Sequence, residues 1–279
     1  MSFELETAVN REGLRRVAID PVSRVEGHGK VTLLLDEAGH VKEARLHIVE
    51  FRGFEKFIQG RPYWEVPVMV QRLCGICPVS HHLAAAKALD PVVGALTLTP
   101  TAEKIRRLMH YGQILQSHAL HFFHLSSPDL LFGFESPVQQ RNIVGVAAAH
   151  PEVARQGVLL RKFGQEVIRI TAGKRVHGTG AVPGGVNKSL TAAERDTLLA
   201  DADQMIAWSR DAVHLARRLH ESDRALYDEF GLFRSHLFSL VRADGAMDLY
   251  DGHLRLRDAR GQIVRDAIPC ADYEQHIVE

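Results

Sequence analysis

The chain has 279 residues, and its 34 lysines and arginines balance 34 aspartates and glutamates, giving a formal net charge of zero. This balance leaves no basic excess to attract phosphates, so nucleic acid is excluded as an expected partner. Hydrophobic residues make up 46% and charged residues 24%, which is typical of a globular chain with a sizeable core. Three cysteines are too few for a disulfide scaffold, and together with the absence of an apolar run of 18 residues they predict a cytoplasmic protein without a membrane span.

The amino-terminal residues 1–16 carry charged side chains and no apolar run, so they predict neither a signal peptide nor an anchor. We expect a flexible extension over 1–16 and a single structural portion over 17–279. Next, the apolar segments Lys30–Leu35 and Val41–Val49 flank a turn-rich stretch and predict a β-hairpin. Val66–Leu73 and Pro78–Asp90 have helical character, and they place Cys74 and Cys77 between two helix-like segments.

Long helices are predicted in the middle of the chain. Thr99 is a candidate cap for the first, Pro151–Ala172 is the second, and a capping-box spacing starts the third at Thr191. From Leu237 onward, short apolar alternations separated by Asp-Gly and Arg-Gly pairs predict a β-meander. The fold class is therefore α+β, with an amino-terminal β-hairpin region, a core of long helices and a β-meander near the carboxyl end. The histidines of the first long helix are interpreted mainly as polar helix positions: His110, His118, His121 and His124.

The segment from Arg72 to Cys77, R-L-C-G-I-C, carries the most specific chemistry. Thiolates at positions i and i+3 around a glycine can turn both sulfurs toward one soft metal. The spacing alone leaves several readings open: half of a zinc site, a thioredoxin-like redox pair, half of a transition-metal cluster site, or two buried structural cysteines. The redox reading expects a preceding strand, whereas Val66–Leu73 has helical character.

Arg72 to Cys77 resembles the first cysteine signature of the large subunit of nickel–iron hydrogenases, R-x-C-G-x-C, with His81 in the place of the family's following histidine. Three further segments resemble family motifs in the same register. They are Arg24-Val25-Glu26-Gly27-His28, Arg52-Gly53-Phe54-Glu55, and His177-Gly178 followed by Pro183-Gly184-Gly185. The surrounding residues look closest to the cytoplasmic NAD-reducing, bidirectional subgroup. The resemblance covers Val17 to Glu279 and implies the family's helical-bundle architecture.

The resemblance implies a catalytic role in the reversible heterolytic cleavage of dihydrogen. It makes Cys74 a terminal nickel ligand and Cys77 a bridge between nickel and an iron that carries carbonyl and cyanide made by maturation proteins. His81 would hydrogen-bond the bridging sulfur and so tune the metal. Glu26 would relay protons, since proton transfer needs a carboxylate within hydrogen-bond reach.

The same resemblance implies other binding residues. Glu55 matches a glutamate that binds magnesium, a hard cation suited to carboxylate oxygen. Arg72 and the loop containing His177, Gly178 and Pro183 would lie against the cluster, and the glycines of this loop permit a close approach. A structural turn and a solvated surface glutamate are the alternative interpretations of the loop and of Glu55.

The chain lacks a complete dinucleotide fingerprint and any multi-cysteine iron–sulfur pattern. Electrons would therefore leave through partners: a small iron–sulfur subunit, and in this subgroup diaphorase subunits that bind flavin and NAD.

The family's second cysteine pair, in a D-P-C-x-x-C-x-x-H motif, is absent, and Cys270 has no partner cysteine after it. Two thiolates alone would not hold a bimetallic cluster stably. We therefore expect the amino-terminal portion of a large subunit, not competent by itself. The alternative function is a non-catalytic scaffold half of a hydrogenase-like or quinone-reductase-like complex. A small thiol oxidoreductase is a third hypothesis.

Overall fold

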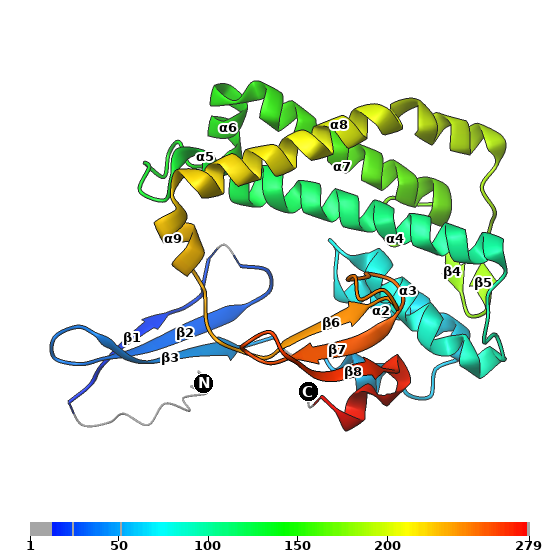
Figure 1. Ribbon diagram of the computed structural model, residues 1–279, viewed down its shortest axis with the longest axis horizontal. Helices are drawn as coiled ribbons and strands as arrows, with labels where there is room; N and C mark the ends of the chain where they lie inside the picture. Colours follow the sequence, from blue (N-terminus) through cyan, green and yellow to red (C-terminus); the bar gives the residue numbers. More distant parts are fainter. Residues whose placement is uncertain (1–12, 24, 51, 278–279) are drawn as a thin grey trace. The chain divides into compact units, whose positions relative to one another are not determined.

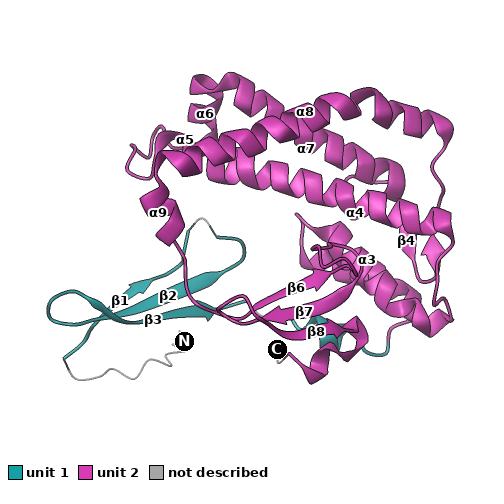
Figure 2. Ribbon diagram, viewed as in Figure 1, with its two compact units in different colours: residues 1–60 teal, residues 61–279 magenta. Residues whose placement is uncertain are grey.

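The computed structural model describes residues 13–23, 25–50 and 52–277, and the chain forms two compact units, residues 1–60 and 61–279 (Figure 2). The first unit contains an antiparallel sheet in the order β1-β2-β3, followed by a short helix. Its elements are β1 (Arg15–Ile19), β2 (Gly29–Leu35), β3 (Val41–Ile48) and α1 (Phe54–Phe57). The predicted hairpin is confirmed as β2 and β3.

The turn of this hairpin has the chemistry that its sequence predicts. Gly39 adopts a φ of 83°, which favours glycine, and the backbone N–H of His40 donates to Asp36 Oδ1 at 2.9 Å. Most of the predicted flexible extension over 1–16 lies outside the described residues. Its last two residues, Arg15 and Arg16, begin β1.

The second unit opens with the elements that surround the cysteines. They are a 3-10 turn (Tyr63–Glu65), α2 (Val66–Val70), a second 3-10 turn (Gln71–Leu73), α3 (Pro78–Leu89) and a third 3-10 turn (Pro91–Val93). Pro78 occupies the first position of α3, where its missing N–H removes no helical hydrogen bond. The two predicted helix-like segments on either side of Cys74 and Cys77 are thus confirmed.

Three long helices lie side by side in the second unit (Figure 1). They are α4 (Pro100–Leu120), α7 (Pro151–Ala172) and α8 (Ala192–Ser222). Each boundary follows from local chemistry: Thr99 Oγ1 accepts the N–H of Ala102, Gly173 ends α7 at a φ of 83°, and Thr191 forms a capping box with Glu194. The predicted boundaries of these helices are confirmed.

Two glycines bring α4 and α7 into backbone contact. A Cβ on Gly112 would lie 2.7 Å from Val167 Cγ1, and one on Gly164 would lie 2.7 Å from the carbonyl oxygen of Gly112. A contact this close excludes a larger residue at either position without a shift of the helices. The two helices therefore form one rigid body beside the cysteine segment. A buried cluster around Met109 connects them to α3 and comprises Val79, Leu83, Ala86, Met109, Ile168, Ala172 and Ala181.

Shorter elements complete the helical part. They are a π-helical turn (His121–Ser126), α5 (Ser127–Phe132), α6 (Ile143–Ala149), the two-stranded ribbon of β4 (Ala181–Val182) and β5 (Gly185–Val186), and α9 (Arg224–Glu229). None of the helices in the described part of the chain is long and apolar enough to cross a bilayer.

The predicted β-meander forms an antiparallel sheet of β6 (Leu237–Val241), β7 (His253–Arg257) and β8 (Ile263–Ile268), and a 3-10 segment (Cys270–Gln275) follows it. One predicted turn differs. The pairs Asp244-Gly245 and Asp251-Gly252 do not enclose a strand but lie in one loop between β6 and β7, where Val241 and Met247 form only an isolated bridge. That loop contacts α3 and α4, as described below.

Candidate metal centre

The two cysteines lie at the ends of a tight loop between the 3-10 turn Gln71–Leu73 and α3. Cys74 has an extended backbone, and Cys77 is the N-cap residue of α3. The backbone N–H groups of Ile76 and Cys77 both point at Cys74 Sγ, at 3.4 and 3.2 Å. Both cysteine side chains are half-buried. The loop therefore holds one sulfur in a nest of two backbone donors, an arrangement that favours a thiolate.

Two buried glutamines of α4 hold the carbonyl of this loop. The Nε2 groups of Gln113 and Gln116 donate to the oxygen of Ile76 at 3.0 and 2.9 Å. No sequence motif pointed to these glutamines, although polar residues at i and i+3 on the buried face of a helix can mark a buried polar contact.

Adjacent histidines of α3 have different environments. His81 is half-buried one turn after Cys77. His82, which the sequence analysis did not single out, is fully buried: its Nδ1 donates to the carbonyl of Pro67 at 2.7 Å, and its Nε2 accepts the N–H of Ala181 at 3.0 Å. Burial lowers the pKa of His82, so the neutral ring that fits both bonds is the stable form.

The predicted loop residues lie beside the cysteine segment. Arg72 Nη1 donates to His177 Nδ1 at 3.1 Å, which joins two motifs that are 105 residues apart. His177 has a left-handed backbone with a φ of 54°, and its Nε2 is buried without a hydrogen-bond partner. A side chain on Gly178 would meet the carbonyl oxygen of Ala172 at 2.6 Å, so packing against the end of α7 already requires a glycine here, in line with the alternative interpretation of a structural turn.

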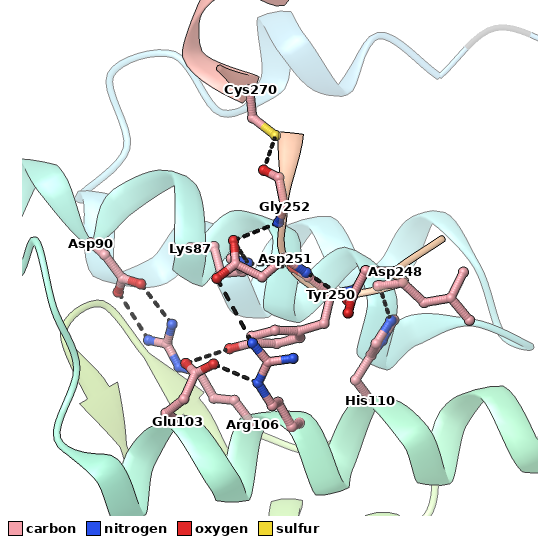
Figure 3. Close-up of polar contacts among 12 residues, drawn as sticks. Lys87, Asp90, Glu103, Arg106, His110, Asp248, Tyr250, Asp251, Gly252 and Cys270 are labelled. Carbon is pink, nitrogen blue, oxygen red and sulfur yellow. Dashed lines mark hydrogen bonds and ion pairs between the residues drawn. The ribbon is translucent and has the colours of Figure 1, made fainter. Parts of the chain in front are cut away.

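A buried ion pair fixes the other end of the loop (Figure 3). Arg106 of α4 is fully buried and donates to both carboxylate oxygens of Asp90, at 2.7 and 2.9 Å. The same guanidinium donates to the carbonyls of Val182 and Gly185, which flank Pro183, and Asp90 accepts the N–H of Gly184. Because every strong donor and acceptor in this cluster is paired, the buried charges are tolerated. No sequence motif pointed to Asp90 or Arg106.

The two predicted glutamates belong to the first unit, and both are exposed. Glu26 lies in the turn between β1 and β2, and Glu55 in the first turn of α1. Glu50, which belongs to neither motif, links them within this unit. Its carboxylate accepts hydrogen bonds from His28, in the motif of Glu26, at 3.0 Å and from Arg52, in the motif of Glu55, at 2.7 Å. Hydrogen bonds from His28 and then Arg52 lower the pKa of Glu50.

His110, one of the polar helix positions that the sequence predicts, makes a tertiary contact. Its Nε2 donates to the carbonyl of Leu249 at 2.6 Å, and burial lowers its pKa. It is part of the contact between α4 and the loop that joins β6 and β7 (Figure 3).

Across 13–23, 25–50 and 52–277, no group of three or more histidine, cysteine, aspartate or glutamate side chains is arranged to hold a metal ion. The donor set offered by the loop is the pair of sulfurs from Cys74 and Cys77. Soft thiolates suit nickel and iron, and a pair at this spacing fits one half of a four-thiolate site. The residues therefore fit a nickel–iron cluster as two of its ligands.

Comparison with known proteins gives a consistent result. Residues 16–51 match a family model described as HoxL-like, and residues 52–132 match the model of the nickel-dependent hydrogenases. The chain is 48% identical to the NAD-reducing hydrogenase HoxS subunit beta of Cupriavidus necator, over 95% of this chain and 56% of that protein. It is 45% identical to a subunit of the vhu F420-non-reducing hydrogenase of Methanocaldococcus jannaschii, over 88% and 59% of the two chains.

Solved structures agree with these relatives. A crystal structure of an NAD+-reducing [NiFe]-hydrogenase in the H2-reduced state matches with a TM-score of 0.91 and 63% identity, over 95% of this chain and 59% of that one. The Ni-Fe-Se hydrogenase from D. vulgaris Hildenborough, at a TM-score of 0.74 and 24% identity, shares the fold. The chain thus spans between half and three fifths of the length of the proteins it matches here.

Proposed function

Because the chain belongs to the nickel-dependent hydrogenase family and has the fold of its large subunit, we propose that it is the metal-binding portion of the catalytic subunit of a NAD-linked nickel–iron hydrogenase. The reaction would be the reversible heterolytic cleavage of dihydrogen, with electrons passed to an iron–sulfur partner subunit. The observation that carries this proposal is the R-L-C-G-I-C loop, in which two backbone N–H groups converge on Cys74 Sγ.

In this proposal Cys74 and Cys77 hold the cluster, and two further thiolates complete its ligand set. When bound, the cluster supplies the redox chemistry that cleaves dihydrogen, and its iron carries carbonyl and cyanide. The chain's own residues then transfer the proton. A cysteine sulfur would accept it, and Glu26 would serve as the carboxylate that relays it, a role for which an exposed carboxylate is suited. His81, one turn after Cys77, would adjust the basicity of a metal-bound cysteine sulfur by a hydrogen bond.

Other residues hold the surroundings of the cluster. Arg72 and His177, which are bonded at 3.1 Å, line the cysteine loop. Gly178 and Pro183 allow the backbone of the 177–185 loop to approach the cluster. Glu55 binds a structural magnesium ion, for which an exposed carboxylate in a short helix is a suitable ligand.

The proposed partners follow from what this sequence lacks. Flavin, NAD and iron–sulfur clusters belong to partner chains, namely the small hydrogenase subunit with its iron–sulfur clusters and the diaphorase subunits, and maturation proteins deliver the metals. The assembly is cytoplasmic in this proposal. Two relatives support a heteromeric complex, because both are named as subunits of hydrogenases.

One observation favours a second function. The described residues offer only the thiolate pair and no third ligand grouped with it. A chain that never acquires the other ligands would be a non-catalytic scaffold that docks an iron–sulfur subunit.

Metal analysis of the assembled protein separates the two functions. A complex with a working hydrogenase subunit contains about one nickel, in addition to the iron of its iron–sulfur partner, and Cys77→Ser removes the nickel. Cys270→Ser is the matched control, because this exposed thiol lies in the 3-10 segment after β8 and should leave the metal content unchanged. Wild-type protein without nickel, or nickel retained in Cys77→Ser, would overturn the catalytic proposal.

A further inference from the structure

One peptide unit of the cysteine loop connects Cys74 Sγ to α4. Its carbonyl belongs to Ile76 and its N–H to Cys77. The N–H donates to Cys74 Sγ at 3.2 Å, while the carbonyl accepts the side-chain amides of Gln113 and Gln116 at 3.0 and 2.9 Å. The two glutamine amides thus hold the carbonyl end of the peptide, and its N–H end donates to Cys74 Sγ.

The two ends of a peptide unit are electronically coupled because its C–N bond has partial double-bond character. Donors that draw electron density toward the carbonyl oxygen make the N–H of the same unit a better donor, and such chains of hydrogen bonds strengthen one another in a low-dielectric interior. The amides of Gln113 and Gln116 therefore act on Cys74 Sγ through the Ile76–Cys77 peptide, although neither touches the sulfur.

Burial indicates that hydrogen bonding, more than packing, accounts for these glutamines. Gln113 is 2% exposed and Gln116 is 4% exposed. The Nε2 of each is bonded to the Ile76 carbonyl, whereas the Oε1 of Gln113 is buried without a hydrogen-bond partner. A buried amide costs free energy unless it is hydrogen-bonded, and an apolar side chain of the same length would fill the space without that cost. The helix that carries the pair is rigidly seated, because Gly112 brings its backbone against α7.

We propose that Gln113 and Gln116 are positioning residues that hold the Ile76–Cys77 peptide with its N–H directed at Cys74 Sγ, and that this hydrogen bond sets the redox potential of a metal bound to Cys74. The second clause rests on the proposed function. A hydrogen bond to a metal-bound thiolate draws electron density from the sulfur, and this raises the reduction potential of the site.

Hydrogen exchange tests the positioning without any metal. The variant Gln113→Met/Gln116→Met keeps the length of both side chains and removes both donors. In the metal-free full chain, we expect the amide of Cys77 to exchange about tenfold faster than in wild type. Each single variant retains one donor and should show a smaller increase. The control Gln204→Met carries the same substitution at an exposed position of α8 and should exchange as wild type does. Unchanged exchange in the double variant would overturn the inference.

The second measurement is the midpoint potential of the nickel signal in the assembled protein. The double variant should shift the redox equilibrium about threefold toward the oxidised form, which is about 28 mV at 59 mV per tenfold change for one electron. Nickel bound at an unchanged potential would overturn the tuning. If the wild-type protein binds no nickel, while the double variant still exchanges the Cys77 amide faster than wild type, the proposed function is overturned and the positioning is confirmed.

Discussion

Replacing Arg106 by methionine should be among the most damaging single changes in the second unit. The substitution leaves the Asp90 carboxylate, whose side chain is 12% exposed, with the N–H of Gly184 as its remaining strong donor. It also removes the donors to the carbonyls of Val182 and Gly185. Removing one partner of a buried ion pair costs about 3–5 kcal/mol. We expect about 4 kcal/mol, which lowers the midpoint of urea unfolding by about 1.3 M at a slope of about 3 kcal/mol/M.

The assay is urea unfolding followed by the helical circular dichroism signal, which arises mostly from the second unit. The control is Arg217→Met, which breaks an exposed pair with Glu221 on α8 and should leave the midpoint close to wild type. The double variant Asp90→Leu/Arg106→Met removes both charges and should recover part of the loss. A midpoint for Arg106→Met within about 0.3 M of wild type would refute the reasoning, because the unpaired carboxylate would then cost little.

Three further predictions concern neighbouring contacts. Burial lowers the pKa of His82, so below about pH 6.5 the unfolded chain binds a proton at this residue more readily than the folded chain does. The free energy of unfolding should therefore fall as the pH drops from 7.5 to 5.5. His82→Gln should show a smaller fall in its urea midpoint over this range, and an equal fall would contradict the assignment. Gly180→Ala should lower the melting temperature by several degrees, because its Cβ would lie 2.3 Å from Met109 Cε and 2.4 Å from the carbonyl oxygen of Thr171. Gly185→Ala meets nothing within 4 Å and should melt as wild type does, so equal effects of the two changes would exclude the steric explanation. Tyr250→Leu should increase protease cleavage between β6 and β7, and unchanged cleavage would show that this side chain does not anchor the loop.

The last of these predictions rests on a dense contact around Tyr250 (Figure 3). Lys87 Nζ lies 4.0 Å from the centre of the Tyr250 ring, and the guanidinium carbon of Arg107, a residue of α4, lies 4.4 Å from the same centre. The hydroxyl donates to Glu103 at 3.3 Å. Burial, followed by the nearby Glu103 carboxylate, raises the pKa of Tyr250 to about 12. Its phenol therefore remains a proton donor at neutral pH.

The parts of the fold that the sequence predicted are those governed by local chemistry. The capping box of Thr191, the stop at Gly173 and the proline start at Pro151 each define a helix end within a few residues, so the pattern is sufficient there. The π-helical turn at His121–Ser126 was not predicted, because it continues α4 without any breaker residue.

For the candidate site, the sequence predicted the motif residues but not the residues that support them. Cys74 and Cys77 are recognisable by their spacing. His82 and Asp90, in contrast, contact backbone N–H groups that are 99 and 94 residues away, and no local pattern encodes such partners. The two hydrogen bonds to the Ile76 carbonyl likewise join residues 37 and 40 positions apart, so they become visible only when α4 is placed beside the cysteine loop.

The bond between Lys87 of α3 and the carbonyl of Tyr250 has a consequence for synthesis. The bond joins residues 163 positions apart, so the ribosome completes the cysteine loop and α3 long before it adds Tyr250, whose carbonyl accepts the bond. At about 5–20 residues per second, the delay is roughly 8 to 33 seconds. During that time the cysteine loop already carries both thiols, but α3, which follows it, lacks its contact with the β6–β7 loop. The nascent chain thus passes through a stage in which both thiols are present and the contacts that surround them are still being made.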